Sequence, residues 1–253
     1  MARAWKRLLI ALSAALAASG AGVVQGASTT VTVPGIADVW LAGQPNGTVL
    51  NGGFPGSDVA PTNSPVLASS GLNLAAGSVL TVSATGGTDY NGCPSTTPDA
   101  GNCGNANVAA AFGISAFVGP ANSLIGVFLD ASVPGGAAPA GLNFSTPGSL
   151  AQASIAPQLR QVFFIGDGRT GTGTGNVQQI VVPAGATRLF LGQADGLGAN
   201  YNNFGSFNVT VTDSAAPAAS TEAIPVDAPW ALALTALLIA ASFAWRRRAT
   251  RRR

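Results

Sequence analysis

The stretch Ser206-Phe-Asn-Val-Thr-Val-Thr212 alternates apolar and polar side chains along its whole length. A period of two is typical of a β-strand that buries one face and exposes the other to water. Ser78-Val-Leu-Thr-Val-Ser83 shows the same alternation earlier in the chain. From Thr29 to Asp213, short runs rich in Val, Ile, Leu, Phe and Thr recur between Gly, Pro, Asn and Asp, without helical periodicity of useful length. The sequence therefore predicts an all-β fold.

The number and spacing of these runs predict a β-sandwich of the jelly-roll type in residues 28–213. The segment 170–176 is of low complexity (TGTGTGN), and we expect it to be a mobile loop. The expected strands are Asp38–Ala42, Val66–Ala68, Ser78–Ala84, Val108–Val118, Ser123–Leu129, Arg160–Ile165, Gln178–Val182, Thr187–Ala194 and Ser206–Thr212.

The charge of the chain is distributed very unevenly. Residues 28–227 contain three arginines and all ten carboxylates, which leaves this span with a net charge of −7. So acidic a span is a poor partner for nucleic acid, whereas it suits either a cation or an ordinary secreted surface. The chain has no histidine and only one Glu, which argues against histidine-based catalysis, the usual zinc sites and paired-carboxylate glycosidase chemistry. We expect a protein that is not an enzyme.

Cys93 and Cys103 lie in a loop rich in Pro, Gly and Asn. In an exported protein a local disulfide is the natural interpretation of such a pair, and a reactive thiol pair is the alternative.

The N-terminal residues 1–27 have the three parts of a secretory signal peptide. A basic patch at Arg3-Ala-Trp-Lys-Arg7 precedes an apolar run from Leu8 to Ala18 and then a region of small residues. Cleavage after Ala21, Gly26 or Ala27 fits this layout. A retained membrane anchor is the alternative, but the apolar run is short for a membrane span.

After a linker of small residues at 214–223, the C-terminal residues 224–253 combine a Pro-containing motif, an apolar segment and two Arg triplets. The segment from Pro229 to Trp245 would span about 25 Å as a helix, the lower limit for a bilayer. Trp230 and Trp245 stand at its two edges, and the arginines predict a cytoplasmic C-terminus with the body outside. An ordinary single-pass anchor is one interpretation of this tail.

The tail also resembles the PEP-CTERM and IPTL-CTERM class of bacterial sorting signals. The resemblance rests on the motif Ile224-Pro225-Val-Asp-Ala-Pro229-Trp230, the apolar segment and the terminal arginines, although this motif departs from the commonest forms. It implies an exported protein of the cell envelope, which remains in the membrane or is released. It also implies recognition by an exosortase-type transpeptidase as partner.

The most informative loop lies in Leu189-Phe-Leu-Gly-Gln-Ala-Asp195-Gly-Leu-Gly-Ala199-Asn-Tyr-Asn202-Asn203-Phe-Gly-Ser-Phe207. Two expected strands flank residues 195–204. Calcium takes carboxylate, amide and backbone oxygens, so Asp195, Asn202 and Asn203 would converge on one ion if the loop folds back on itself. Asp, Asn and Gly also fill ordinary turns, which is the other interpretation of this composition.

This loop is similar to that of the small bacterial galactophilic (PA-I-like) lectins, which bind sugar through a calcium ion. The resemblance covers roughly residues 36–212 and implies a β-sandwich with the ion at one edge. It places the metal ligands at Asp195, Ala199 (backbone carbonyl), Asn202 and Asn203, with Tyr90 as the remaining carbonyl ligand after Ala84-Thr-Gly. It also implies that Asp195 accepts a hydrogen bond from a sugar hydroxyl.

One departure from the lectin pattern matters. The family's sugar pocket uses a His and a Gln after the Tyr, whereas this chain has no His and carries the Cys93–Cys103 loop there. Galactose specificity is therefore not carried over. The expected function is calcium-dependent binding of carbohydrate such as extracellular polysaccharide, without catalysis. The alternative is a structural surface or matrix protein whose sandwich binds no ligand.

Three further features have both a functional and a structural interpretation. Asp89 would add charge beside Tyr90, or belong to an exposed turn. Asp167 and Arg169 would form a second polar site, or a turn. Trp40 would stack on a sugar ring, or pack in the core.

Overall fold

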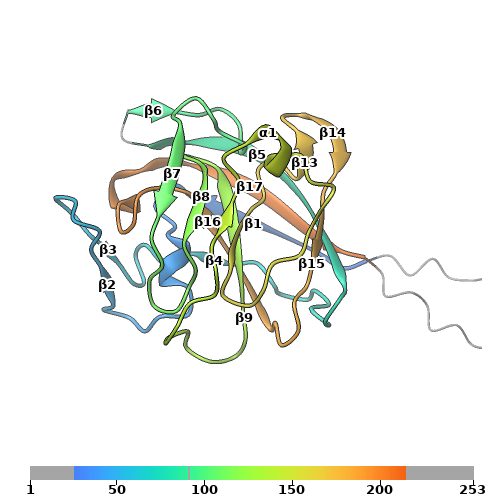
Figure 1. The fold of residues 1–253 in the computed structure, drawn as a ribbon, viewed down its shortest axis with the longest axis horizontal. Coiled ribbons are helices and arrows are strands. Elements are labelled where there is room, and N and C mark those ends of the chain that lie inside the picture. The colour runs from blue at the N-terminus through green and yellow to red at the C-terminus, as the bar shows by residue number, and fades with distance from the viewer. Residues whose placement is uncertain (1–25, 91, 215–253) are drawn as a thin grey trace, which may run out of the picture. The chain divides into compact units, whose positions relative to one another are not determined.

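The computed structural model describes residues 26–90 and 92–214 (Figure 1). Within these residues the chain is almost entirely β-structure, which confirms the all-β expectation. No helix in this part of the chain has the length and apolar character that crossing a membrane requires. Nearly all of the expected signal peptide, the linker beyond residue 214 and the whole sorting tail with its helix lie outside the described residues.

The largest sheet contains the two termini of the described body. Its strand order is β1-β17-β5-β15-β11, and β6 pairs with the end of β5. The β17 strand runs antiparallel to both β1 and β5, so the alternating stretch at 206–212 lies in the middle of three long strands. The six strands of this sheet are β1 (Ser28–Pro34), β5 (Val79–Tyr90), β6 (Cys93–Pro94), β11 (Ser154–Ile155), β15 (Gln179–Val181) and β17 (Phe204–Asp213).

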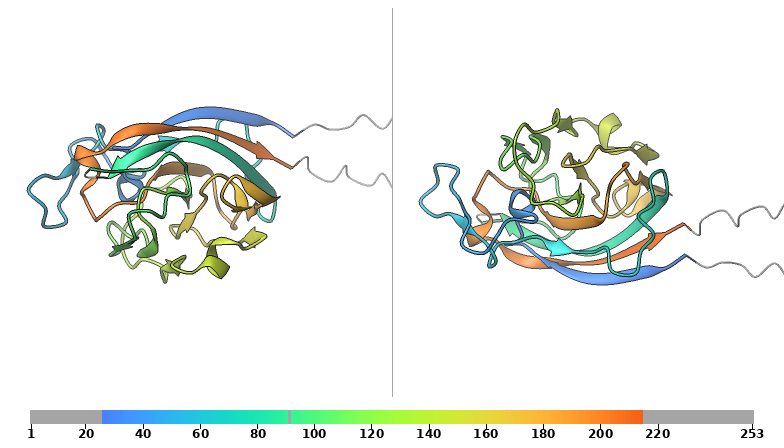
Figure 2. Two further views of the ribbon diagram at one scale, coloured as in Figure 1. Left: turned by 90° about the horizontal axis from the view of Figure 1, so that it is seen from above. Right: turned by 90° about the horizontal axis from the view of Figure 1, so that it is seen from below.

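A second sheet, in the order β12-β9-β16-β4, faces the concave side of the first (Figure 2). Its central strand β9 is buried along its whole length, because a further layer of loops and short strands covers its other face. Such double burial produces a continuous apolar run in place of alternation. The strands are β4 (Val66–Leu67), β9 (Leu124–Leu129), β12 (Val162–Phe164) and β16 (Arg188–Gln193).

The remaining elements are short. A small sheet has the order β10-β8-β7, and two hairpins, β2–β3 and β13–β14, project from the body. Their bounds are β2 (Val49–Leu50), β3 (Asp58–Val59), β7 (Asn105–Val108), β8 (Phe117–Pro120), β10 (Leu142–Asn143), β13 (Arg169–Gly171) and β14 (Thr174–Val177). The helical turns are η1 (Val39–Leu41), α1 (Pro147–Leu150) and η2 (Asn200–Asn202).

The apolar core lies between the two large sheets and continues beneath the outer layer. Val209 and Val211 of β17 are fully buried, as is Leu80 of β5. In the second sheet, the rings of Phe128 and Phe163 stack with centroids 5.4 Å apart. The polar residues between the buried positions of β17 are more exposed, as the period of two predicts.

Several expected strand boundaries were wrong. The run Asp38–Ala42 contains the 3₁₀ turn η1 in place of a strand, because the Asp38 carboxylate accepts the backbone N–H of Trp40 and caps the turn. The run Val108–Val118 is divided between β7 and β8 by a turn in which Phe112 and Gly113 have positive φ. The segment 170–176, expected to be a loop, forms most of the β13–β14 hairpin. The strand β1 was missed, although STTVTVP alternates.

The expected disulfide is confirmed. Cys93 and Cys103 are bonded, with their Cα atoms 6.0 Å apart. The bond closes a loop that starts immediately after β5, because β6 turns back on that strand and Cys93 pairs with Tyr90.

Candidate functional site

The loop at 195–204 folds back on itself and brings its two ends into contact. It leaves β16 after Gln193, makes the 3₁₀ turn η2 and returns as β17. Asn203 Nδ2 donates a hydrogen bond to Asp195 Oδ2 at 2.8 Å. The other oxygen of this carboxylate accepts the N–H of Gly196. The side chains of Asp195 and Asn203 are therefore adjacent, as a shared ion would require.

The environment of Asp195 is unfavourable for a free negative charge. The residue is only 1% exposed. Burial raises the pKa of its carboxyl to about 6, and the charge of Asp58 acts in the same direction, against the hydrogen bonds from Asn203 and Gly196. Asn203 Oδ1 is buried and has no hydrogen-bond partner. The Asp195 oxygens are thus both paired, and the buried oxygen that a hard cation would satisfy is Asn203 Oδ1, in the amide group next to this carboxylate.

The other expected ligands lie around this pair but outside its hydrogen bonds. Ala199 is buried and precedes η2. Asn202 is partly buried within η2 and makes none of the contacts described above. Tyr90 ends β5, one residue beyond Asp89, which pairs with Phe204 at the start of β17. The fold thus places Tyr90 beside the end of the loop.

A chain of buried polar side chains connects this loop to the disulfide loop. Asn203 Nδ2 also donates to Gln193 Oε1 at 2.9 Å, and Gln193 Nε2 donates to Asn122 Oδ1. Asn122 Nδ2 in turn donates to the carbonyl of Cys93 at 2.6 Å. Because Gln193 and Asn122 are fully buried, these bonds hold the two loops in a defined relation.

Two carboxylates that the sequence analysis did not select also belong to this region. Asp38 and Asp58 are both 0% exposed, and their carboxyl groups are close enough for each to influence the pKa of the other. Burial raises the pKa of both, and for Asp38 the neighbouring Asp58 and Asp195 raise it further. Asn200, also fully buried, donates its backbone N–H to Asp58 Oδ2 at 2.9 Å. The available sequence signal was Asp38 standing inside an otherwise apolar run, Ile36–Ala42.

Partly exposed aromatic rings surround the same loop. Phe204 is 71% exposed and Phe54 is 45% exposed. The ring of Phe54 covers Gly196, where an added Cβ would lie 2.8 Å from Phe54 Cζ. The hydroxyl of Tyr201 in η2 accepts the N–H of Gly56 at 3.1 Å. The hairpin β2–β3 and the loop at 195–204 therefore present aromatic side chains at the same end of the molecule.

The remaining candidates have the contacts of structural residues. Trp40 is 1% exposed and donates its indole N–H to the carbonyl of Ser115 at 2.9 Å, so it packs in the core. Asp89 is partly buried, and its carboxylate accepts the N–H of Gly92 in a turn. The Asp167 carboxylate accepts the backbone N–H of Arg169, also in a turn.

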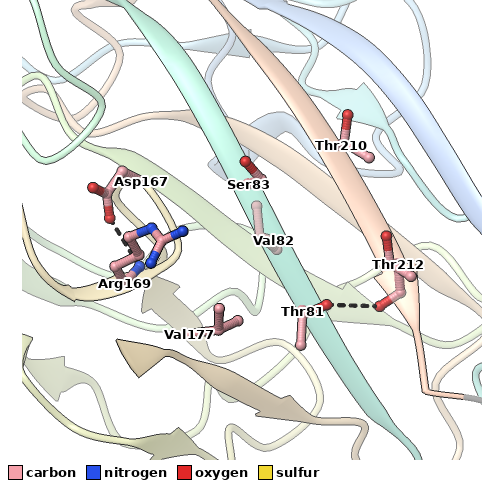
Figure 3. Close-up of a pocket in the computed structure, with 8 residues that line it drawn as sticks. All are labelled: Thr81, Val82, Ser83, Asp167, Arg169, Val177, Thr210 and Thr212. Carbon is pink, nitrogen blue, oxygen red and sulfur yellow. Dashed lines mark hydrogen bonds between the residues drawn. The ribbon is translucent and has the colours of Figure 1, made fainter. Parts of the chain in front are cut away.

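Asp167 and Arg169 also line a small pocket against β5 and β17 (Figure 3). Its volume is about 150 Å³, below the range of roughly 300–1,000 Å³ of typical small-molecule sites. The other lining residues are Thr81, Val82, Ser83, Val177, Thr210 and Thr212.

Within the described residues, no group of three or more His, Cys, Asp or Glu side chains is placed to hold a metal ion. Any cation site here must therefore combine one or two carboxylates with amide or backbone oxygens, which calcium accepts. Comparisons of the chain with protein-family models, with curated proteins and with solved structures found no match.

Proposed function

We propose that this chain is an exported, non-catalytic β-sandwich module that binds carbohydrate through a calcium ion held by the loop at 195–204. The observation that carries the proposal is the contact between Asp195 and Asn203, with the unpaired Asn203 Oδ1 beside it. Two residues eight positions apart would not meet inside the protein unless the loop folded back. The contact places the Asp195 carboxylate next to the amide group of Asn203, and an ion would be bound by both side chains once that amide turned its oxygen toward it.

The accessible side of the site determines how a sugar would bind. Asp195 is buried and both its oxygens already accept hydrogen bonds, so a sugar hydroxyl cannot reach this carboxylate in the present conformation. Asn202 lies on the more exposed side of the loop. We therefore propose that hydroxyls complete the coordination of the ion from the side of Asn202. Phe54 and Phe204 would pack against the apolar faces of neighbouring sugar units.

The two ends of the chain support delivery of this module to the envelope. The basic and apolar segments within 1–27 and the tail at 224–253 have the composition of export and sorting signals. In this proposal the signal peptide exports the body, the apolar tail holds it in the membrane, and an exosortase-type enzyme processes the tail. Extracellular polysaccharide is then the carbohydrate within reach.

Calcium titration of the full-length chain, purified in detergent, tests the ion. At a hundredfold excess over its dissociation constant, a ligand specific for the folded state stabilises it by about 2.7 kcal/mol. For a domain of this size that corresponds to a rise in Tm of roughly 5–10 °C. The variant Asn202→Ala should reduce this rise but leave the Tm in chelator unchanged, since Asn202 makes none of the buried hydrogen bonds.

A glycan array probed with and without chelator tests the sugar. Retention that requires calcium and is lost in Asn202→Ala supports the proposal. The control is Asp130→Asn, which removes a carboxylate distant in sequence from the loop at 195–204. If wild type and Asn202→Ala respond identically to calcium and no glycan is retained, the lectin proposal fails. The chain would then be a structural surface protein, in which Asp195→Ala leaves surface association unchanged.

A further inference from the structure

A second pair of carboxylates is held face to face by the backbone around it. The backbone N–H of Asp38 donates to the carbonyl of Asn63 at 2.9 Å, and Asn63 Nδ2 donates to the carbonyl of Ile36 at 3.1 Å. The side-chain oxygen of Asn63 accepts the N–H of Val59 at 3.1 Å. Asn63 therefore ties the segment before η1 to the strand β3, and this brings Asp38 against Asp58.

Each of these carboxylates has one satisfied oxygen and one unsatisfied oxygen. Asp38 Oδ1 accepts the N–H of Trp40, and Asp58 Oδ2 accepts the N–H of Asn200. Asp38 Oδ2 and Asp58 Oδ1 are buried without a partner. Asn200 Oδ1 is a third buried oxygen without a partner, and it belongs to the residue whose backbone contacts Asp58. Buried oxygens that lack partners require an explanation, such as an ion or a proton.

Within residues 26–90 and 92–214, no cationic side chain is placed to neutralise this pair. Residues 28–227 contain no Lys or His and only three arginines. Each arginine donates to a backbone carbonyl elsewhere: Arg160 to Gly135, Arg169 to Gly175 and Arg188 to Asp130. The carboxylate of Asp195, whose charge raises the pKa of Asp38, adds further negative charge near the pair. Two buried carboxylates without a counter-charge are strongly unfavourable.

We propose that Asp38 and Asp58 bind a divalent cation, with calcium as its physiological form, at a site separate from the ion of the loop at 195–204. The three unpaired oxygens come from the cap of η1, from β3 and from η2. Calcium prefers carboxylate and amide oxygens and completes its shell with backbone carbonyls and water. A single shared proton would satisfy the two oxygens but leave one negative charge buried, whereas a divalent cation neutralises both carboxylates.

A cation at this site would fix the arrangement of the surface where sugar is proposed to bind. Binding of the cation does not itself require binding of sugar. A cation between Asp38 and Asp58 would connect the cap of η1 to the β2–β3 hairpin, and through Asn200 Oδ1 also to η2. The hairpin carries Phe54 and η2 carries Tyr201 and Asn202. Its occupation therefore fixes the position of the aromatic rings relative to the loop at 195–204.

The test is calcium binding by the full-length chain in detergent, measured as the number of ions per chain and the calcium-dependent change in Tm. The double variant Asp38→Asn/Asp58→Asn keeps acceptors for the N–H groups of Trp40 and Asn200 and removes both charges. We expect it to bind one ion fewer, or to bind that ion at least about tenfold more weakly, since even loss of residues outside a metal's ligand shell weakens binding 10- to 100-fold. In chelator it should be as stable as wild type or more stable.

The variant Asn202→Ala separates this site from the lectin proposal. We expect it to retain the ion bound by Asp38 and Asp58, whatever the glycan array shows. The inference is overturned if the double variant binds calcium and gains stability as wild type does. It is also overturned if Asn202→Ala does not respond to calcium and is stabilised only by acid, since the pair would then share a proton.

Terbium luminescence provides a second measurement if the double variant does not fold. Among the described residues Trp40 is the one tryptophan, and its backbone N–H donates to the Asp38 carboxylate, so excitation of tryptophan should sensitise a terbium ion held there. Emission from wild type and from Asn202→Ala should be equal and should fall when calcium competes. Absence of sensitised emission in both proteins would contradict the site.

Discussion

At the scale of single residues, the most informative group is the buried carboxyl of Asp195. The pKa of Asp195 is raised to about 6, mainly by burial. A raised pKa means that the folded protein holds this proton more tightly than the unfolded chain does. The same direction holds for Asp38 and Asp58. The region therefore favours protons or cations over free negative charge.

The stability of the cation-free protein should consequently decrease as the pH rises. For Asp195 the folded state binds more protons between the ordinary carboxyl pKa of about 4 and its own value of about 6, so the free energy of unfolding falls across that window. The loss should be on the order of 3 kcal/mol. Urea unfolding in chelator at several pH values measures it.

Calcium should restore the stability that the cation-free protein has lost by pH 7, because the ion replaces the proton on the carboxylate. The variant Asp195→Asn should show a smaller decrease than wild type. A wild-type protein whose stability in chelator increases between pH 4 and pH 6 would contradict the raised pKa.

Gly205 is a second position where one residue decides local structure. It has a φ of +79°, and an added Cβ would lie 2.5 Å from the carbonyl oxygen of Gly87 on β5. Gly205→Ala should therefore destabilise the protein by roughly 1–3 kcal/mol and displace the start of β17. Gly148→Ala is the matched control, because Gly148 lies in α1 with open space around it and Ala favours a helix. Equal stabilities of the two variants in urea would refute this account.

At the scale of elements, the strands are long and regular only where the chain alternates or is continuously apolar. The β5 and β17 strands pair along ten residues and hold the loop at 195–204 at their edge. The site itself is built from the connections: η1, the β2–β3 hairpin, η2 and the disulfide loop. Connections of this kind carry function because a rigid sheet positions them.

The disulfide should stabilise the loop that follows β5. Closing a loop of this length contributes roughly 2–3 kcal/mol by constraining the unfolded chain. Cys93→Ser/Cys103→Ser should lower the free energy of unfolding by that amount, and reduced wild type should behave in the same way. Because Asn122 joins Cys93 to Gln193, the double variant should also weaken calcium binding at the loop. Unchanged calcium affinity would show that the polar chain does not couple the two loops.

Most long strands of the two large sheets could be predicted from the sequence, but the short elements could not. Period-two alternation identified the regions of β5 and β17, and the apolar runs identified β9, β12 and β16. The run Asp38–Ala42 was misassigned because an apolar run of that length fits a strand or a buried turn equally well. The hairpin β13–β14 was missed because Thr and Gly alone show no apolar face.

At the scale of the whole molecule, the two ends of the sequence determine where the body should be found. We predict that the native protein lacks the signal peptide and, if the sorting enzyme acts, also lacks the residues after the motif at 224–230. Mass spectrometry of the protein from its own cells measures both ends. Replacing the motif prolines, Pro225 and Pro229, with Ala should leave the tail intact and the protein in the membrane fraction. An uncut wild-type tail would instead indicate an ordinary anchor.

The candidate site could be predicted only in part, because some of its residues lie far apart along the chain. Asp195 and Asn203 lie close in sequence, so a loop motif was enough to select them. Asp38 and Asp58 are far from the loop in the chain, and each alone has the sequence signature of an ordinary turn or cap residue. From the turn at 200–202 the sequence analysis selected Asn202, whereas the structure places Asn200, which was not selected, in the buried network.

The sequence by itself determined the all-β class and the disulfide, because both follow from patterns that are local along the chain. It also indicates the export and sorting signals, through the order of charged, apolar and small residues. Only the tertiary structure showed that three carboxylates from distant segments gather in one buried place. That gathering depends on which strands pair and how the connections cross the ends of the sheets, and these are properties of the packed molecule.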